Sequence, residues 1–262
     1  MRGFSFASVV LSYFLVGGGM FVGLLAAGLI KVESEMVVYA LMAAGAAVGG
    51  FVAARASLGS TILEAAIGAV AVVATVVGLA AGTEVGKLLW HVAPDATMKF
   101  VGTIGVAATG GAIAGAFVSE KLLGEPSASS LPWLLYAALA TFGACVLATV
   151  FASVLATSAK NEADVESLAA GLIAGMGIGA LLAGLASGAS ARARPLLTCL
   201  LGGGLGTAGF VYLIKVLAGG GAKTSDGDAT TAIAVFGVLG AVVTLIGTLI
   251  GWFTVGKRNA QA

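Results

Sequence analysis

The sequence predicts an all-α fold: a polytopic membrane helix bundle of about eight transmembrane helices, built from four parallel two-helix hairpin repeats. Three observations support this prediction: the composition, the length of the apolar windows, and a glycine-rich ending that recurs four times. Of 262 residues, 59% are hydrophobic and only 10% are charged, and the mean hydropathy is +1.09. Soluble domains carry about 25% charged residues, so this chain could not cover a water-facing surface.

Eight apolar windows each approach or exceed the roughly 20 residues that a helix needs to cross a bilayer. They lie at residues 8–30, 36–54, 61–82, 100–118, 131–157, 167–190, 196–218 and 230–255. We expect helices because backbone groups in lipid must bond internally, and because the windows are far longer than barrel strands and show no alternation. The first window is longer than the roughly 7–15-residue apolar region of a signal peptide, so we expect it to be a span.

The second, fourth, sixth and eighth windows end in the same way, with small residues on one helix face and then a basic residue. Steps of four place residues on one face, and glycine faces let helices approach closely. We therefore predict helix packing at these positions; a self-association seam or a narrow pore is the alternative. The packing positions are Gly45, Gly49, Gly111, Gly115, Gly171, Gly175, Gly179, Gly247 and Gly251, and the basic residues are Arg55, Lys121, Arg192 and Lys257.

A second match supports a repeat. The triplet Gly17, Gly18 and Gly19 precedes Leu-Ile-Lys-Val at 29–32, and the triplet Gly202, Gly203 and Gly204 precedes the same tetrapeptide at 213–216. Duplication of a hairpin would produce this pattern, and coincidence in a glycine, alanine and leucine alphabet is the alternative. Hairpins of two spans all enter from one side, so the repeats would be parallel.

The expected domains are two four-helix halves. The first half is residues 1–118, with hairpins 8–54 and 61–118. A cytoplasmic linker follows at 119–130, and the second half is 131–262, with hairpins 131–190 and 196–255.

Eight spans put both termini on one side of the membrane. Basic residues favour that side only weakly, by seven to six, and we expect both termini in the cytoplasm. Compact loops and the Ala/Gly/Leu-rich composition suggest a bacterial inner membrane. Trp90 and His91 are expected in an interfacial loop.

Glu64 is the only acidic residue inside a predicted span. Acids within membranes are costly and mark functional sites, which makes Glu64 a candidate ion or proton site. Thr61 and Glu64 also fit a capping box, so a helix cap is the competing interpretation. Because no proline interrupts a span (Pro132 suits a helix start), the two glycine triplets are the remaining candidate pathway groups, together with the hydroxyls of Thr103, Thr109, Thr244 and Thr248.

Other chemistry lacks a sequence signal. Cys145 and Cys199 lie in apolar windows, where buried packing is expected, and no nucleotide, metal or hydrolase motif occurs. We expect no enzyme activity, no cofactor, no bound metal and no nucleic-acid partner. Two functions stay open: a passive channel or small-solute or ion transporter, and a non-catalytic membrane scaffold or subunit. The expected partners are the lipid bilayer and, for the second function, a homo-oligomer or other membrane subunits.

Overall fold

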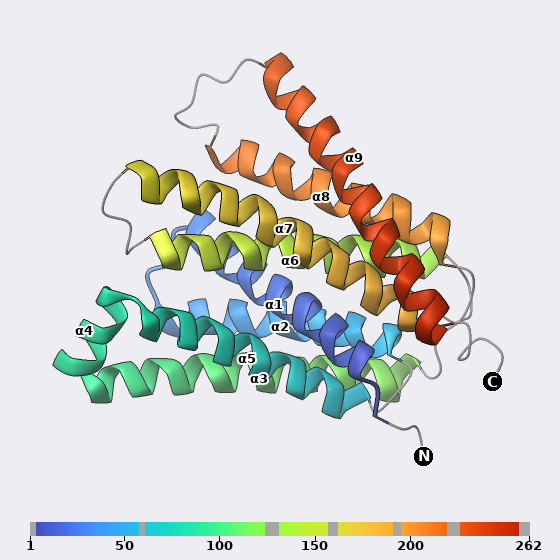
Figure 1. Cartoon of the computed structure of the whole chain (residues 1–262). Coiled ribbons are helices and arrows are strands. Elements are labelled where there is room, and N and C mark those ends of the chain that lie inside the picture. The colour runs from blue at the N-terminus through green and yellow to red at the C-terminus, as the bar shows by residue number, and fades with distance from the viewer. Residues whose placement is uncertain are drawn as a thin grey trace. The chain divides into compact units, whose positions relative to one another are not determined.

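The computed structural model describes residues 4–57, 61–123, 131–156, 162–190, 195–218 and 226–256 (Figure 1). This part of the chain holds nine α-helices and a closing π-helical turn. They are α1 (Phe6–Leu29), α2 (Glu35–Ala56), α3 (Thr61–Gly82), α4 (Glu84–Val92), α5 (Pro94–Leu123), α6 (Leu131–Ala156), α7 (Glu162–Ser190), α8 (Leu196–Ala218), α9 (Asp226–Gly251) and η1 (Trp252–Gly256). All but α4 and η1 are long and apolar enough to cross a membrane. The predicted helical class and eight long apolar helices are confirmed, and they fit an integral membrane protein.

The segment around Trp90 and His91 is helical, so the expected loop is wrong. It forms α4, a nine-residue helix. Thr83 begins it by accepting a hydrogen bond from the Gly86 N–H at 3.1 Å. A Cβ on Gly86 would collide with the Ala80 carbonyl oxygen, so the turn between α3 and α4 requires glycine. Val85 and Leu88 are exposed, as are the charged side chains of α4, which therefore suits a membrane interface.

Helices α5 and α7 extend furthest beyond the expected windows. Helix α5 begins at Pro94, where a proline costs nothing because the first turn has no N–H partner to lose. It continues to Leu123, into the segment expected to be a linker, while residues 124–130 lie outside the described residues. Helix α7 begins at Glu162, five residues before its window.

The end of α1 shows that equal sequences need not adopt equal structures. Lys31 has a positive φ of 51°. The N–H of Lys31 bonds to the Gly28 oxygen at 3.2 Å, and the Val32 N–H bonds to the Ala27 oxygen at 3.0 Å. These two bonds form a Schellman ending. The same tetrapeptide at 213–216 continues as helix inside α8, so the duplicated residues end one helix and extend the other.

The chain divides into two compact units, whose boundaries fall inside α6 and α7. Unit 1 comprises Met1–Pro126 and Leu147–Met176; unit 2 comprises Ser127–Val146 and Gly177–Ala262. We describe each unit separately.

In unit 1, α2 packs closely against both α1 and α5. Helices α1 and α2 run in opposite directions, since Gly19 faces Gly45 and Gly23 faces Leu41. Helices α2 and α5 run in the same direction, since Ala43 faces Gly111 and Ala47 faces Gly115. Helix α3 packs on α1 and α5.

Unit 2 also contains both antiparallel and parallel pairs of packed helices. Helices α8 and α9 run in opposite directions, since Gly203 contacts Thr244 and Thr207 contacts Gly240. Helices α7 and α9 run in the same direction: Gly184 faces Thr244, and Gly188 faces Thr248. Helix α6 packs on α8 through Gly202 and Gly206, which lie against Leu134 and Ala138.

Candidate functional site

Glu64 is fully buried at a point where several helix ends meet. One carboxylate oxygen accepts a hydrogen bond from the Ser5 N–H at 2.7 Å, and the other accepts one from the Ser57 hydroxyl. Ser5 begins α1, and Ser57 follows the last residue of α2. In a capping box Glu64 would bond only to the backbone of its own helix, α3. The two bonds described here instead connect Glu64 to the start of α1 and to the end of α2.

A second bond extends this group of helix ends. The hydroxyl of Thr61, the first residue of α3, donates to Glu120 near the end of α5 at 2.8 Å. Glu64 also lies in the first turn of α3, a position that the helix dipole makes favourable for an acidic side chain. The described contacts of Glu64 therefore hold α1, α2 and α3 together at one end of unit 1.

The glycine triplets lie at helix contacts. A Cβ on Gly17 would come within 2.8 Å of the Leu147 side chain, and one on Gly19 would meet the backbone of α2. In unit 2, a Cβ on Gly202 would meet the Leu134 carbonyl oxygen, and one on Gly203 the Thr244 side chain. Gly204 is less crowded, because a Cβ there would lie 3.2 Å from the Ala241 side chain. Gly18 is buried in α1.

The other glycines singled out from sequence occupy different surroundings. Gly45, Gly49, Gly111, Gly115, Gly247 and Gly251 each leave too little room for a Cβ against a neighbouring helix backbone. Gly179 faces Ala144 closely, and Gly175 faces Ala148 at an ordinary contact distance. A Cβ on Gly171 would meet nothing within 4 Å. Arg192 and Lys257 lie outside the described residues.

Unit 2 contains a group of buried hydroxyls and thiols, which we call the hydroxyl seam. Its members are Thr141 and Cys145 on α6, Ser187 and Ser190 on α7, Cys199 and Thr207 on α8, and Thr244 and Thr248 on α9, all at most 5% exposed. They connect across helices: Cys145 is hydrogen-bonded to Thr207, and Cys199 to Thr248. The spacing of Cys199, Gly203 and Thr207 places these residues on one face of α8.

Only some of the seam's oxygens have a described protein partner. The Thr207 hydroxyl donates to the Gly203 oxygen at 2.9 Å, and that of Thr248 donates to the Thr244 oxygen at 2.8 Å. The side-chain oxygens of Thr141, Ser187, Ser190 and Thr244 have no partner among the described residues. A buried hydroxyl without a partner costs about 1–3 kcal/mol, so these four oxygens would gain from a water or a polar solute.

Along α8 the seam extends from Cys199 to Thr207, eight residues or about 12 Å at 1.5 Å per residue. Phe210 follows one turn later and packs edge-to-face on Phe142, with ring centroids 6.2 Å apart. An aromatic pair thus lies beside the seam, next to its last hydroxyl on α8.

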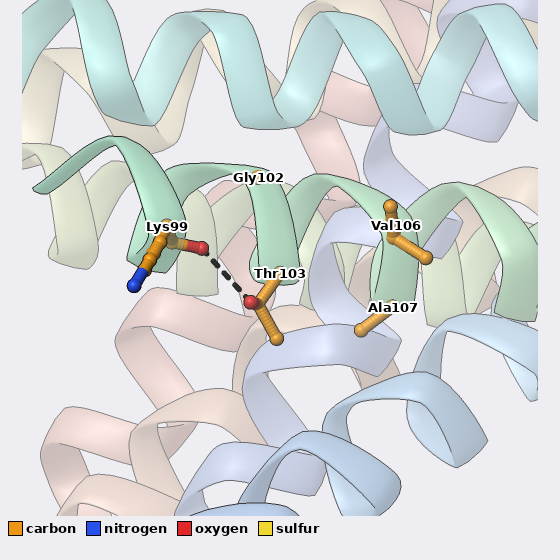
Figure 2. Close-up of a pocket in the computed structure, with 5 residues that line it drawn as sticks. All are labelled: Lys99, Gly102, Thr103, Val106 and Ala107. Carbon is orange, nitrogen blue, oxygen red and sulfur yellow. Dashed lines mark hydrogen bonds between the residues drawn. The ribbon is translucent and has the colours of Figure 1, made fainter. Parts of the chain in front are cut away.

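Unit 1 has two hollows of different character. Figure 2 shows a surface hollow of about 560 Å³ on α5, lined by Lys99, Gly102, Thr103, Val106 and Ala107. The Thr103 hydroxyl donates to the Lys99 oxygen of its own helix at 2.8 Å. Thr103 is exposed, and Val106 is 75% exposed, so this expected pathway hydroxyl lies on an outer face of α5.

The second hollow, which we call the apolar cavity, has a volume of about 340 Å³. It lies among α1, α2, α3, α4, α5 and the part of α6 that belongs to unit 1. Its wall includes Met20, Phe21, Val73, Val77, Trp90 and Phe100.

Sequence reasoning named only Thr244 and Thr248 of the seam as pathway residues. The missed signal was the four-residue spacing that puts Cys199 and Thr207 on one face of an apolar helix. Within the described residues, no group of three His, Cys, Asp or Glu side chains could hold a metal ion. The chain matches no family model, no curated protein and no solved structure.

Proposed function

We propose that this membrane protein conducts a small uncharged polar solute, or water, passively through unit 2. The single observation that carries the proposal is the hydroxyl seam with its four unpartnered buried oxygens. Hydroxyls both donate and accept hydrogen bonds, so they can replace part of the hydration shell of a polyol or a water molecule.

The chemistry of the seam favours a neutral solute over an ion. Among the described residues of unit 2, the seam consists of serine and threonine hydroxyls and two cysteine thiols, and none of the hydroxyls carries a charge. Moving an ion out of water requires paired charges or many oxygen ligands, and neutral hydroxyls alone supply few. A coupled transporter also needs buried ionisable groups. Glu64, the buried acid of unit 1, is occupied with Ser5 and Ser57.

We propose further that the aromatic pair Phe142 and Phe210 closes the seam at its inner end. Phe210 lies one turn beyond Thr207, the last seam residue of α8, and Phe142 lies between the seam residues Thr141 and Cys145 of α6. Apolar constrictions gate conduction by excluding water, so a movement of α8 against α6 would open the route.

The proposed topology is four parallel hairpins with both termini in the cytoplasm of a bacterial inner membrane. Support comes from unit 1, where the start of α1, the end of α2, the start of α3 and the end of α5 lie at one end. The same alternation in unit 2, with α7 and α9 running in one direction, suits a repeated hairpin.

Solute flux into proteoliposomes tests the proposal. Stopped-flow swelling in glycerol or another small polyol should be faster than in protein-free liposomes. Thr244→Val removes one unpartnered oxygen while nearly keeping the shape, and we expect at least a threefold loss of flux. Thr103→Val is the matched control, because its hydroxyl bonds only its own helix on an exposed face; it should leave the flux unchanged. Wild-type flux equal to that of empty liposomes would refute the proposal.

A non-catalytic scaffold or subunit is the second candidate, and the hollow on α5 favours it (Figure 2). Gly102 in this hollow, and Gly110 eight residues further along α5, have open space where a Cβ would lie. Small outward-facing residues let a helix of another subunit, or of a second copy, pack closely. If this function holds, Gly102→Leu should abolish a defined oligomer seen by cross-linking in native membranes and leave the monomer folded.

A further inference from the structure

We propose that the apolar cavity of unit 1 binds one acyl chain of a bilayer phospholipid. This proposal is independent of solute conduction through unit 2, because it concerns different residues and a different ligand. Its volume of about 340 Å³ falls within the roughly 300–1,000 Å³ of ordinary ligand pockets.

The lining excludes water as the occupant. Nearly all the side chains that line the cavity are aliphatic or aromatic, among them Met20, Val73, Val76 and Val150. The lining residues with a polar side-chain group are Trp90 and Thr97, and the Thr97 hydroxyl already donates to the Ala93 oxygen at 2.8 Å. A buried water needs two to four polar partners, and apolar cavities stay dry and take apolar ligands.

The direction of the cavity matches a lipid chain. On α3 the lining extends from Ala81, at the end of the helix, to Val73, eight residues deeper, which is about 12 Å. Helix α4 covers the shallow end with Leu89 and Trp90, and Trp is typical of the level at which lipid chains begin. A hydrocarbon leaflet is about 15 Å deep, half of the roughly 30 Å core, so the cavity follows the path of one chain.

The cavity also has a route of entry from the bilayer. Leu24, Leu89 and Phe100 line it and are 38%, 51% and 55% exposed. They belong to three different helices, α1, α4 and α5, so the wall is open between them. A chain can thus move in sideways while its headgroup stays at the interface beside α4.

Photo-cross-linking tests the assignment. The full-length protein is reconstituted in nanodiscs containing a phosphatidylcholine with a diazirine near the end of one acyl chain, and labelled peptides are identified by mass spectrometry. We expect labels on the inward-facing residues Met20, Val73 and Val150, at about one lipid per protein. Val73→Trp, which fills the cavity, should lower labelling of Met20 and Val150 at least tenfold. Val70→Trp, on the exposed side of the same helix, should not lower it.

Three outcomes would overturn the proposal. One is labelling of the wild type spread over outward-facing residues alone. Another is cavity labelling that Val73→Trp and Val70→Trp leave equal. The third is displacement of the label by a polyisoprenoid but not by excess unlabelled phosphatidylcholine. Because the wild-type label map stands without any variant, a failure of Val73→Trp to fold does not prevent the test, and Ala81→Phe provides a second way of filling the cavity.

Discussion

Two adjacent glycines of α5 provide a direct test of the packing described above. Gly111 faces α2, and Gly110 faces away from the described helices. A Cβ on Gly111 would lie 2.3 Å from the Ala43 carbonyl oxygen, whereas one on Gly110 would meet nothing within 4 Å. The two alanine substitutions thus add the same methyl group to the same helix, one residue apart, in opposite environments.

The magnitude follows from this geometry. Ordinary contact begins at 3.4 Å, so Gly111→Ala must separate α2 from α5 locally by about 1 Å. A gap of 0.5–1 Å already loses roughly a quarter to a half of the dispersion energy of each affected atom pair, and overpacking a close contact costs about 1–3 kcal/mol. The higher helix propensity of alanine returns up to about 1 kcal/mol. We therefore expect a net destabilisation of about 1–2 kcal/mol for Gly111→Ala and a change between zero and about 1 kcal/mol of stabilisation for Gly110→Ala.

Reversible unfolding in mixed micelles, followed by circular dichroism as SDS is added, measures both changes. The midpoint for Gly111→Ala should fall below that of the wild type, and the midpoint for Gly110→Ala should not. Equal shifts for the two variants would refute the close approach of α2 and α5, because helix propensity alone would then explain both.

Three further predictions concern other parts of the chain. Glu64→Gln replaces one accepting oxygen with a donor, so it should lower the unfolding free energy by about 1–3 kcal/mol. The solute flux per folded molecule should stay at the wild-type level. A loss of flux with unchanged stability would contradict a structural role for Glu64. Lys31→Gly relieves a left-handed conformation that costs a non-glycine residue about 1–2 kcal/mol, and the SDS midpoint should rise, whereas Lys215→Gly, inside α8, should lower it. Cys145 and Cys199 are fully buried, so a membrane-permeant maleimide should label neither thiol in the folded protein and both after unfolding; rapid labelling of the folded protein would show that unit 2 is open.

The eight long helices could be predicted because the bilayer sets one strong requirement. Each span must be about 20 apolar residues long, and the windows at 61–82 and 196–218 coincide with α3 and α8. The amphipathic helix α4 was not predicted from the sequence, because a helix of nine residues is too short to meet the criterion for a span. Its start depends on the Thr83 cap and on the approach of Gly86 to Ala80.

The candidate sites were less predictable, because they depend on which helices meet. Glu64 was identified from sequence as a buried acid, but Ser5 and Ser57 are 59 and 7 residues away along the chain, and no spacing rule connects them. Thr103 and Thr244 were equivalent as hydroxyls inside apolar windows. In the structure Thr103 lies on an exposed face and Thr244 is fully buried.

The sequence by itself determined that this chain forms long apolar helices suited to a bilayer, because hydropathy and length are local properties that need no partner. It also marked the glycines at which helices could approach. Only the tertiary structure decided which glycines do so, which hydroxyls of unit 2 share a buried seam, and that unit 1 leaves an apolar cavity beneath α4. These features arise from contacts between residues far apart in the chain, and the register of one helix against another is set by packing that no single segment contains.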